Sequence, residues 1–153
     1  MKTRLFIALA GLAISFALPI FAQTNKPDPQ LREKLVAVVK DFTDAVNNNA
    51  AAVVAPLFTE DAVLVPPEGP INGRQAIEKW FADLFQRVHV SDNLLTVDQD
   101  SPHIIGTAGN AIWANGAWSA TLKVQNLGSL QAKGFWTVIR EGDDLKIKML
   151  TWN

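Results

Sequence analysis

The chain contains no cysteine, no tyrosine and only two histidines among its 153 residues. Without cysteine there are no disulfides, thiol nucleophiles or thiolate metal sites, so apolar burial alone must hold the fold together. Without tyrosine no phenolic hydroxyl is available as a proton donor. His89 and His103 have no neighbouring partner at a metal-ligand spacing, so we expect neither a metal nor a cofactor.

The sequence also lacks an excess of either charge. It has 14 basic and 15 acidic residues, and 48% of its residues are hydrophobic. A protein that binds nucleic acid would carry a basic surface, so we expect no nucleic-acid partner. Length and composition predict one globular domain.

The N-terminus has the pattern of an export signal. Lys2 and Arg4 precede an uncharged apolar run from Leu5 to Phe21, and Ala22 offers a small residue for cleavage. We therefore expect a signal peptide over 1–22 and one mature domain over 23–153, periplasmic or secreted and not held in a membrane. The apolar run is nearly long enough to span a bilayer, so an uncleaved anchor is the alternative.

Hydrophobic periodicity predicts helices in the first half of the mature chain. A first helix begins after Asp28-Pro29 and ends at the Asn47-Asn48-Asn49 run. A short second helix covers 50–55, and a strand over 62–65 stops at Pro66-Pro67. A third helix begins near Gly73 and ends before 91–93, which leads out of it.

From residue 94 the apolar period changes to two. We expect strands over 94–105, 111–124, 130–141 and 145–152, separated by turns short enough to make them antiparallel neighbours. The predicted class is α+β: three N-terminal helices packed on a curved antiparallel sheet, a cone-like half barrel with a central pocket.

Two segments resemble a known family. They are Leu57-Phe58-Thr59-Glu60-Asp61-Ala62-Val63 and the run from Asn72-Gly73-Arg74 to Trp80-Phe81, with Pro66-Pro67-Glu68-Gly69 between them. The chain resembles the nuclear-transport-factor-2-like superfamily, and within it the SnoaL-like group and the domain of unknown function 4440. The resemblance covers about residues 31–153 and implies the fold. It does not imply one activity, because that superfamily includes isomerases, dehydratases, epoxide hydrolases and binding modules.

The resemblance allows the catalytic positions of ketosteroid isomerases to be checked in this chain by an ungapped comparison. The general base falls on Pro66, the oxyanion-stabilising tyrosine on Phe42 and the second proton donor on Phe135. None of these side chains can exchange a proton. The same register places Trp113 and Asn115 on the pocket side of their strand, Thr137 on the next strand and Trp152 near the mouth. The implied pocket is aromatic, with a few neutral hydrogen-bonding groups.

Two classes of function remain open. The first is a domain that binds a small apolar molecule, without a recognisable catalytic set, and that pairs through its sheet as a homodimer. The second is an isomerase, hydro-lyase or hydrolase that uses Asp61 or His103 as general base and Asn115 as orienting group. An association module for a larger partner is a third reading, with less support because no other domain is attached.

Overall fold

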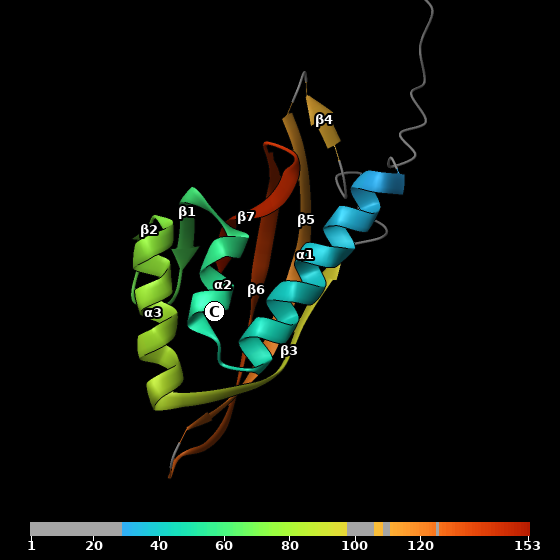
Figure 1. Ribbon diagram of the computed structural model, residues 1–153. Coiled ribbons are helices and arrows are strands. Elements are labelled where there is room, and N and C mark those ends of the chain that lie inside the picture. Colours follow the sequence, from blue (N-terminus) through green and yellow to red (C-terminus); the bar gives the residue numbers. More distant parts are fainter. Residues whose placement is uncertain (1–28, 98–105, 109–110, 125) are drawn as a thin grey trace, which may run out of the picture.

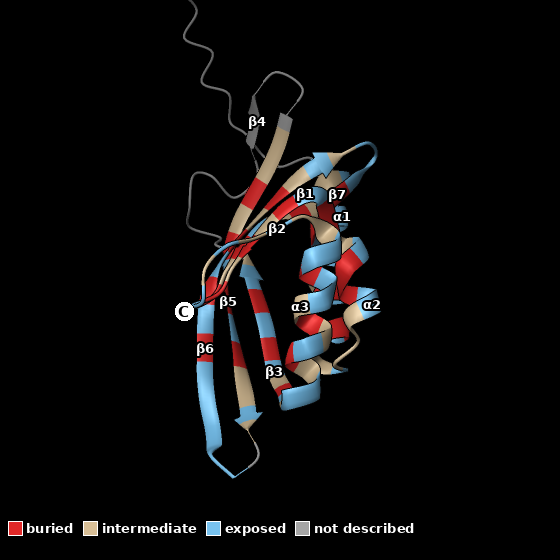
Figure 2. Ribbon diagram, turned by 90° about the vertical axis from the view of Figure 1, so that its left-hand side faces the viewer, coloured by how far each residue is buried: buried red, intermediate tan, exposed pale blue. Residues whose placement is uncertain are grey.

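A computed structural model of the chain describes residues 29–97, 106–108, 111–124 and 126–153. The expected signal peptide and His103 lie outside these residues. Helix α1 covers Pro29–Asn47, α2 covers Ala51–Val54 and runs into a 3-10 turn, Ala55–Leu57, and α3 covers Arg74–Arg87. All three lie on one side of a bent sheet (Figures 1 and 2). No helix within the described residues is long and apolar enough to cross a membrane.

The sheet has the strand order β2-β1-β7-β6-β5-β3, and β4 pairs with β5 beside this series. The strands are β1 Phe58–Val65, β2 Ile71–Asn72, β3 Val88–Val97, β4 Gly106–Ala108, β5 Ala111–Val124, β6 Gly128–Glu141 and β7 Asp144–Thr151. All pairs are antiparallel except β1 with β7, which is parallel. The α+β class is confirmed, and the sheet differs from the prediction in being mixed.

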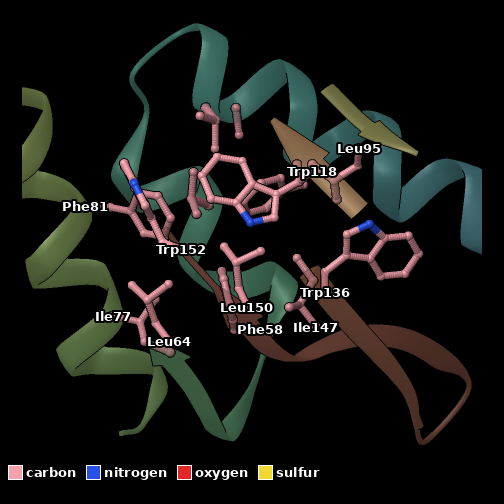
Figure 3. Packing of buried hydrophobic residues seen from close by; sticks show 14 of the residues in the cluster. Phe58, Leu64, Ile77, Phe81, Leu95, Trp118, Trp136, Ile147, Leu150 and Trp152 are labelled. Atoms are coloured by element: carbon pink, nitrogen blue, oxygen red, sulfur yellow. The ribbon is translucent and has the colours of Figure 1, made fainter. Parts of the chain in front are cut away.

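The core fills the space between the helices and the sheet face that they cover. Phe42 of α1, Phe58 of β1 and Phe81 of α3 form a cluster with ring centroids 6.0–6.3 Å apart. Trp118 of β5 and Trp152, which follows β7, pack edge to face with centroids 5.2 Å apart (Figure 3). Aromatic burial of this kind supplies much of the stability that a domain without disulfides needs.

Two glycine–tryptophan pairs set the spacing of β5 and β6. Gly116 lies opposite Trp136, and Trp118 lies opposite Gly134. A Cβ atom added at Gly116 would lie 2.0 Å from the backbone oxygen of Thr96 and 2.5 Å from Cζ2 of Trp136. Each glycine therefore leaves the room that the indole ring on the neighbouring strand occupies.

Several elements differ from the sequence prediction, and β2 was not predicted. Strand β1 begins four residues earlier than the expected strand over 62–65, and residues 106–108, predicted as a turn, form β4. A further difference is β3, which begins at Val88 and includes the segment 91–93 that was expected to be a connection. Charged and polar residues at 91–93 suggested a loop, but a bulge lets the strand continue through them.

Candidate functional site

An apolar pocket lies between α1, α3 and the helix-facing side of β3, β5 and β7. About 260 Å³ of space between atoms belongs to it, including the part open to solvent. Its lining is Phe42, Val46, Phe81, Leu84, Val90, Asn93, Trp118, Ala120, Leu150 and Trp152. The interior is narrow, so only a molecule the size of water fits without movement of side chains. Leu84 and Trp152, each 8% exposed, are the most accessible residues of the lining.

Asn93 contributes the only amide, hydroxyl or charged group among these lining side chains. The residue is 3% exposed, and both its Oδ1 and its Nδ2 lack a hydrogen-bond partner. By contrast, the indole Nε1 of Trp118 donates to the backbone oxygen of Thr151 over 2.6 Å. Buried polar side chains in folded proteins are nearly always paired, because an unpaired group has lost its bonds to water. The unpaired amide of Asn93 is therefore an exception to this rule and needs an explanation.

A bulge in β3 turns Asn93 toward the pocket. Ser91 pairs with Thr121 and Leu94 with Ser119, so β3 has one residue more than β5 between these pairs. Asp92 takes up the extra length with a left-handed backbone (φ 52°). Without the bulge, residue 92 would share the inner face with Val90; with it, Asn93 and Leu95 are the buried residues.

The backbone of Asn93 is held from the side of α1. Its N–H donates to Oδ1 of Asn47 over 2.8 Å, and its oxygen accepts from Nδ2 of Asn47 over 3.2 Å. Asn49 holds the backbone of Val90 in the same way, with distances of 3.0 and 3.4 Å. The asparagine run that ends α1 therefore clamps the bulged part of β3, and the Asn93 side chain is left to face the pocket.

The sequence-predicted pocket residues are divided between two faces of the sheet. Phe42 and Trp152 line the pocket, and Pro66 is buried just after β1. Asn115, Phe135 and Thr137 line an open groove on the face that points away from the helices, where Thr137 Oγ1 donates to Asn115 Oδ1 over 2.7 Å.

The expectation that all these residues share one pocket is therefore corrected. Phe135 is 66% exposed, whereas its neighbours Gly134 and Trp136 face the helices. Trp113 shares the outer face with Asn115 by strand alternation. Alternation indicates which residues of a strand share a face, but not which face is turned toward the helices. The ungapped comparison assigned the outer face to the pocket. A shift of one residue does not restore an acid, since neither Gly134 nor Trp136 has a carboxyl group.

Asp61, one of the two candidate bases, is not among the residues that line this pocket. Asp61 is 78% exposed in its side chain, and its carboxylate accepts from Lys148 Nζ at 2.5 Å and from the Thr59 hydroxyl at 3.0 Å. These two hydrogen bonds lower the pKa of Asp61 below its usual value of 3.8. His103 lies outside the described residues. Within the described ranges, no three His, Cys, Asp or Glu side chains form a group that could hold a metal ion.

Sequence reasoning missed Asn93. Residues 91–93 are polar and follow the third predicted helix, which is typical of a loop, so the sequence pattern does not single out Asn93. The signal that could have found it is parity: Val88 and Val90 alternate with polar residues, and Leu95 and Val97 resume the alternation out of phase. A change of phase within a strand indicates a bulge, and Asn93 stands at that change.

Comparison with known proteins shows which family and which solved structures this chain is similar to. The family model for the SnoaL-like domain matches residues 39–143. A nuclear transport factor 2-like superfamily protein from Salmonella enterica serovar Typhimurium is 15% identical (TM-score 0.61), with 81% of this chain and 90% of that chain covered. A ketosteroid isomerase-like protein from Erwinia carotovora atroseptica is 13% identical (TM-score 0.61; 78% and 92% covered). A protein of unknown function from Mycobacterium tuberculosis is 18% identical (TM-score 0.63; 80% and 70% covered).

At these identities the solved structures establish the fold alone. No functionally curated protein matches the sequence. The family model begins within α1 and ends at the turn before β7, so it includes the clamp on β3 and the pocket lining except Leu150 and Trp152. The chain belongs to the SnoaL-like domain family, and it shares its fold with the nuclear transport factor 2-like protein from Salmonella enterica.

Proposed function

We propose that this domain binds a small, neutral and largely apolar molecule in the pocket between its helices and its sheet. The observation that carries the proposal is the composition of the lining, in which aromatic and aliphatic side chains surround a single amide. Pockets of this kind hold their ligands by apolar contact and orient them by one or two hydrogen bonds.

The lining argues against a charged ligand. None of its side chains is ionisable, and an ion moved from water into such a site would lose its hydration without gaining a partner. It also argues against proton transfer as the main task, because a general acid or base must lie within hydrogen-bond reach of its substrate. The Asp61 carboxylate is engaged with Lys148 outside the lining instead.

The narrow interior of the pocket means that a ligand must displace side chains to enter, which limits its size to about one ring. Its space of about 260 Å³ includes the part open to solvent, and the enclosed part is small. An engineered apolar cavity of about 150 Å³ accepts one benzene ring, which is far more enclosed space than this pocket has before its walls move, so one ring is the largest ligand that we propose. Trp152 and Leu84, the most accessible residues of the lining, are the side chains whose movement would admit it.

A pair of variants on one strand tests the proposal. Ala120 is buried in the lining, and Ala117 is exposed on the opposite face of β5. Ala120→Leu places a larger side chain in the pocket, whereas Ala117→Leu adds the same atoms outside it. We expect toluene to shift the indole N–H resonances of Trp118 and Trp152 in the wild type and in Ala117→Leu, but not in folded Ala120→Leu. Equal shifts in both variants would place the binding elsewhere and refute the proposal.

Export and self-association complete the proposal. We infer from the N-terminal pattern that the chain is exported with residues 1–22 removed, and from the exposed Phe135 and Met149 on the outer sheet face that it pairs with a second copy there. Native mass spectrometry of the protein purified from its own host tests both, because subunit mass reports cleavage and complex mass reports pairing. A retained small molecule would identify the ligand directly.

A further inference from the structure

We propose that the side-chain amide of Asn93 recognises the ligand by two hydrogen bonds. The ligand then presents a hydrogen-bond donor and an acceptor side by side, as a lactam or an unsubstituted amide does. This inference rests on the proposed function, because it assigns the chemical class of the molecule that the pocket takes. It goes beyond apolar binding, since a hydrocarbon of the same shape would leave the amide unpaired.

The requirement for both groups comes from the two atoms that lack partners. Oδ1 of Asn93 can accept hydrogen bonds and Nδ2 can donate them, and neither has a partner. A ligand with a carbonyl alone would pair Nδ2 and leave Oδ1 buried and unpaired. A ligand with an adjacent N–H and C=O pairs both at once, in the two-bond geometry that Asn also forms with the edge of adenine.

The chain holds this amide in a fixed place. The Asn47 side chain binds both backbone groups of Asn93, so the residue cannot turn outward without breaking two hydrogen bonds. Asp92 keeps a left-handed backbone, which is uncommon for a residue other than glycine, and this conformation makes the bulge. The backbone of Asp92 and the hydrogen bonds from Asn47 together direct an unpaired amide into an apolar pocket. Residues that recognise a ligand are held in place in this way.

The same geometry distinguishes between polar ligands of similar shape. A carboxylic acid offers the same pair of groups only in its protonated form, and the pocket has no cation to bind the carboxylate that dominates at neutral pH. A neutral cis-amide keeps both groups at every physiological pH. We therefore assign the ligand to the neutral lactam and amide class.

Two isomers test the inference without any change to the protein. 3-Methyl-2-pyridone has an N–H beside its carbonyl, and 1-methyl-2-pyridone has the same atoms with that donor blocked. We expect the first to bind the wild-type domain at least tenfold more tightly, measured by titration in ¹H–¹⁵N NMR spectra. It should also shift the side-chain NH₂ signal of Asn93, which is identified by its absence from the spectrum of Asn93→Leu. In that variant the two isomers should bind equally.

Toluene, the probe of the proposed function, separates the possible failures. If toluene binds and the two isomers bind the wild type with equal affinity, Asn93 does not recognise the ligand. The pocket proposal then stands without this inference. If none of the three compounds binds, the pocket proposal fails and this inference fails with it. The comparison of isomers in the wild type decides the matter even if Asn93→Leu does not fold.

Discussion

Replacement of Asn93 by leucine is expected to make the ligand-free domain more stable. Leucine has the same number of non-hydrogen side-chain atoms and the same branching, but it has no group that needs a hydrogen bond. Each unpaired buried group costs about 1–3 kcal/mol, so the two groups of Asn93 cost at least about 2 kcal/mol together. Most substitutions of buried residues destabilise a protein, which makes the expected sign unusual.

The magnitude is large enough to measure. We expect the free energy of unfolding to rise by at least about 1 kcal/mol after allowance for imperfect packing of the leucine. For a domain of this size that corresponds to an increase in Tm of about 3–5 °C. Urea unfolding followed by tryptophan fluorescence measures the free energy, and a scan of circular dichroism measures Tm.

Asn47→Ala is the matched control for this experiment. It removes the two hydrogen bonds to the backbone of Asn93, so buried backbone groups lose their partners and the domain should be destabilised by about 1–3 kcal/mol. The two asparagines are neighbours in space but should act with opposite signs. A loss of stability of 1 kcal/mol or more in Asn93→Leu would show that the Asn93 amide is paired in solution, and it would refute the reasoning.

Three further predictions concern other parts of the molecule. Gly116→Ala should lower the free energy of unfolding by about 3 kcal/mol or more in urea, because the new Cβ meets the backbone of Thr96; a stable variant would contradict the packing described. The lowered pKa of Asp61 contributes stability that is complete above pH 3.8 and is lost as the pH falls through the lower folded-state value. Asp61→Asn should therefore flatten the loss of stability in acid, and an unchanged acid profile would exclude the Lys148 pair as its source. Phe135→Glu should shift the mass in native mass spectrometry from dimer to monomer without loss of toluene binding, whereas a persistent dimer would place the interface elsewhere.

Much of the fold could be predicted from local patterns. The first helix ends at the asparagine run as expected, because its apolar stripe is long and regular and the run interrupts it. Strand β5 has the predicted bounds, since alternation continues over its whole length. Phe42 and Trp152, which the family resemblance placed near the pocket, both lie in the lining of the apolar pocket.

The face of the sheet could not be chosen from alternation alone. Each of β5 and β6 has tryptophan two residues after glycine, at Gly116–Trp118 and Gly134–Trp136. Paired antiparallel, each indole lies over the glycine of the other strand. That repeated spacing identifies the buried face and would have put Asn115, Phe135 and Thr137 on the outer one. The parallel contact of β1 with β7 had no local signal, because it joins segments that are far apart in the chain.

The position of β7 has a consequence for how the domain forms. The last strand of the domain, β7, is an interior strand, hydrogen-bonded to β6 on one side and to β1 on the other. Contacts such as that of Lys148 with Asp61 span 87 residues. A growing chain can thus form α1 and α3 early, but it cannot close its core until the C-terminal segment is free. The domain therefore remains accessible to chaperones until β7 has been made, and a chain truncated before Asp144 would leave β1 paired with β2 alone.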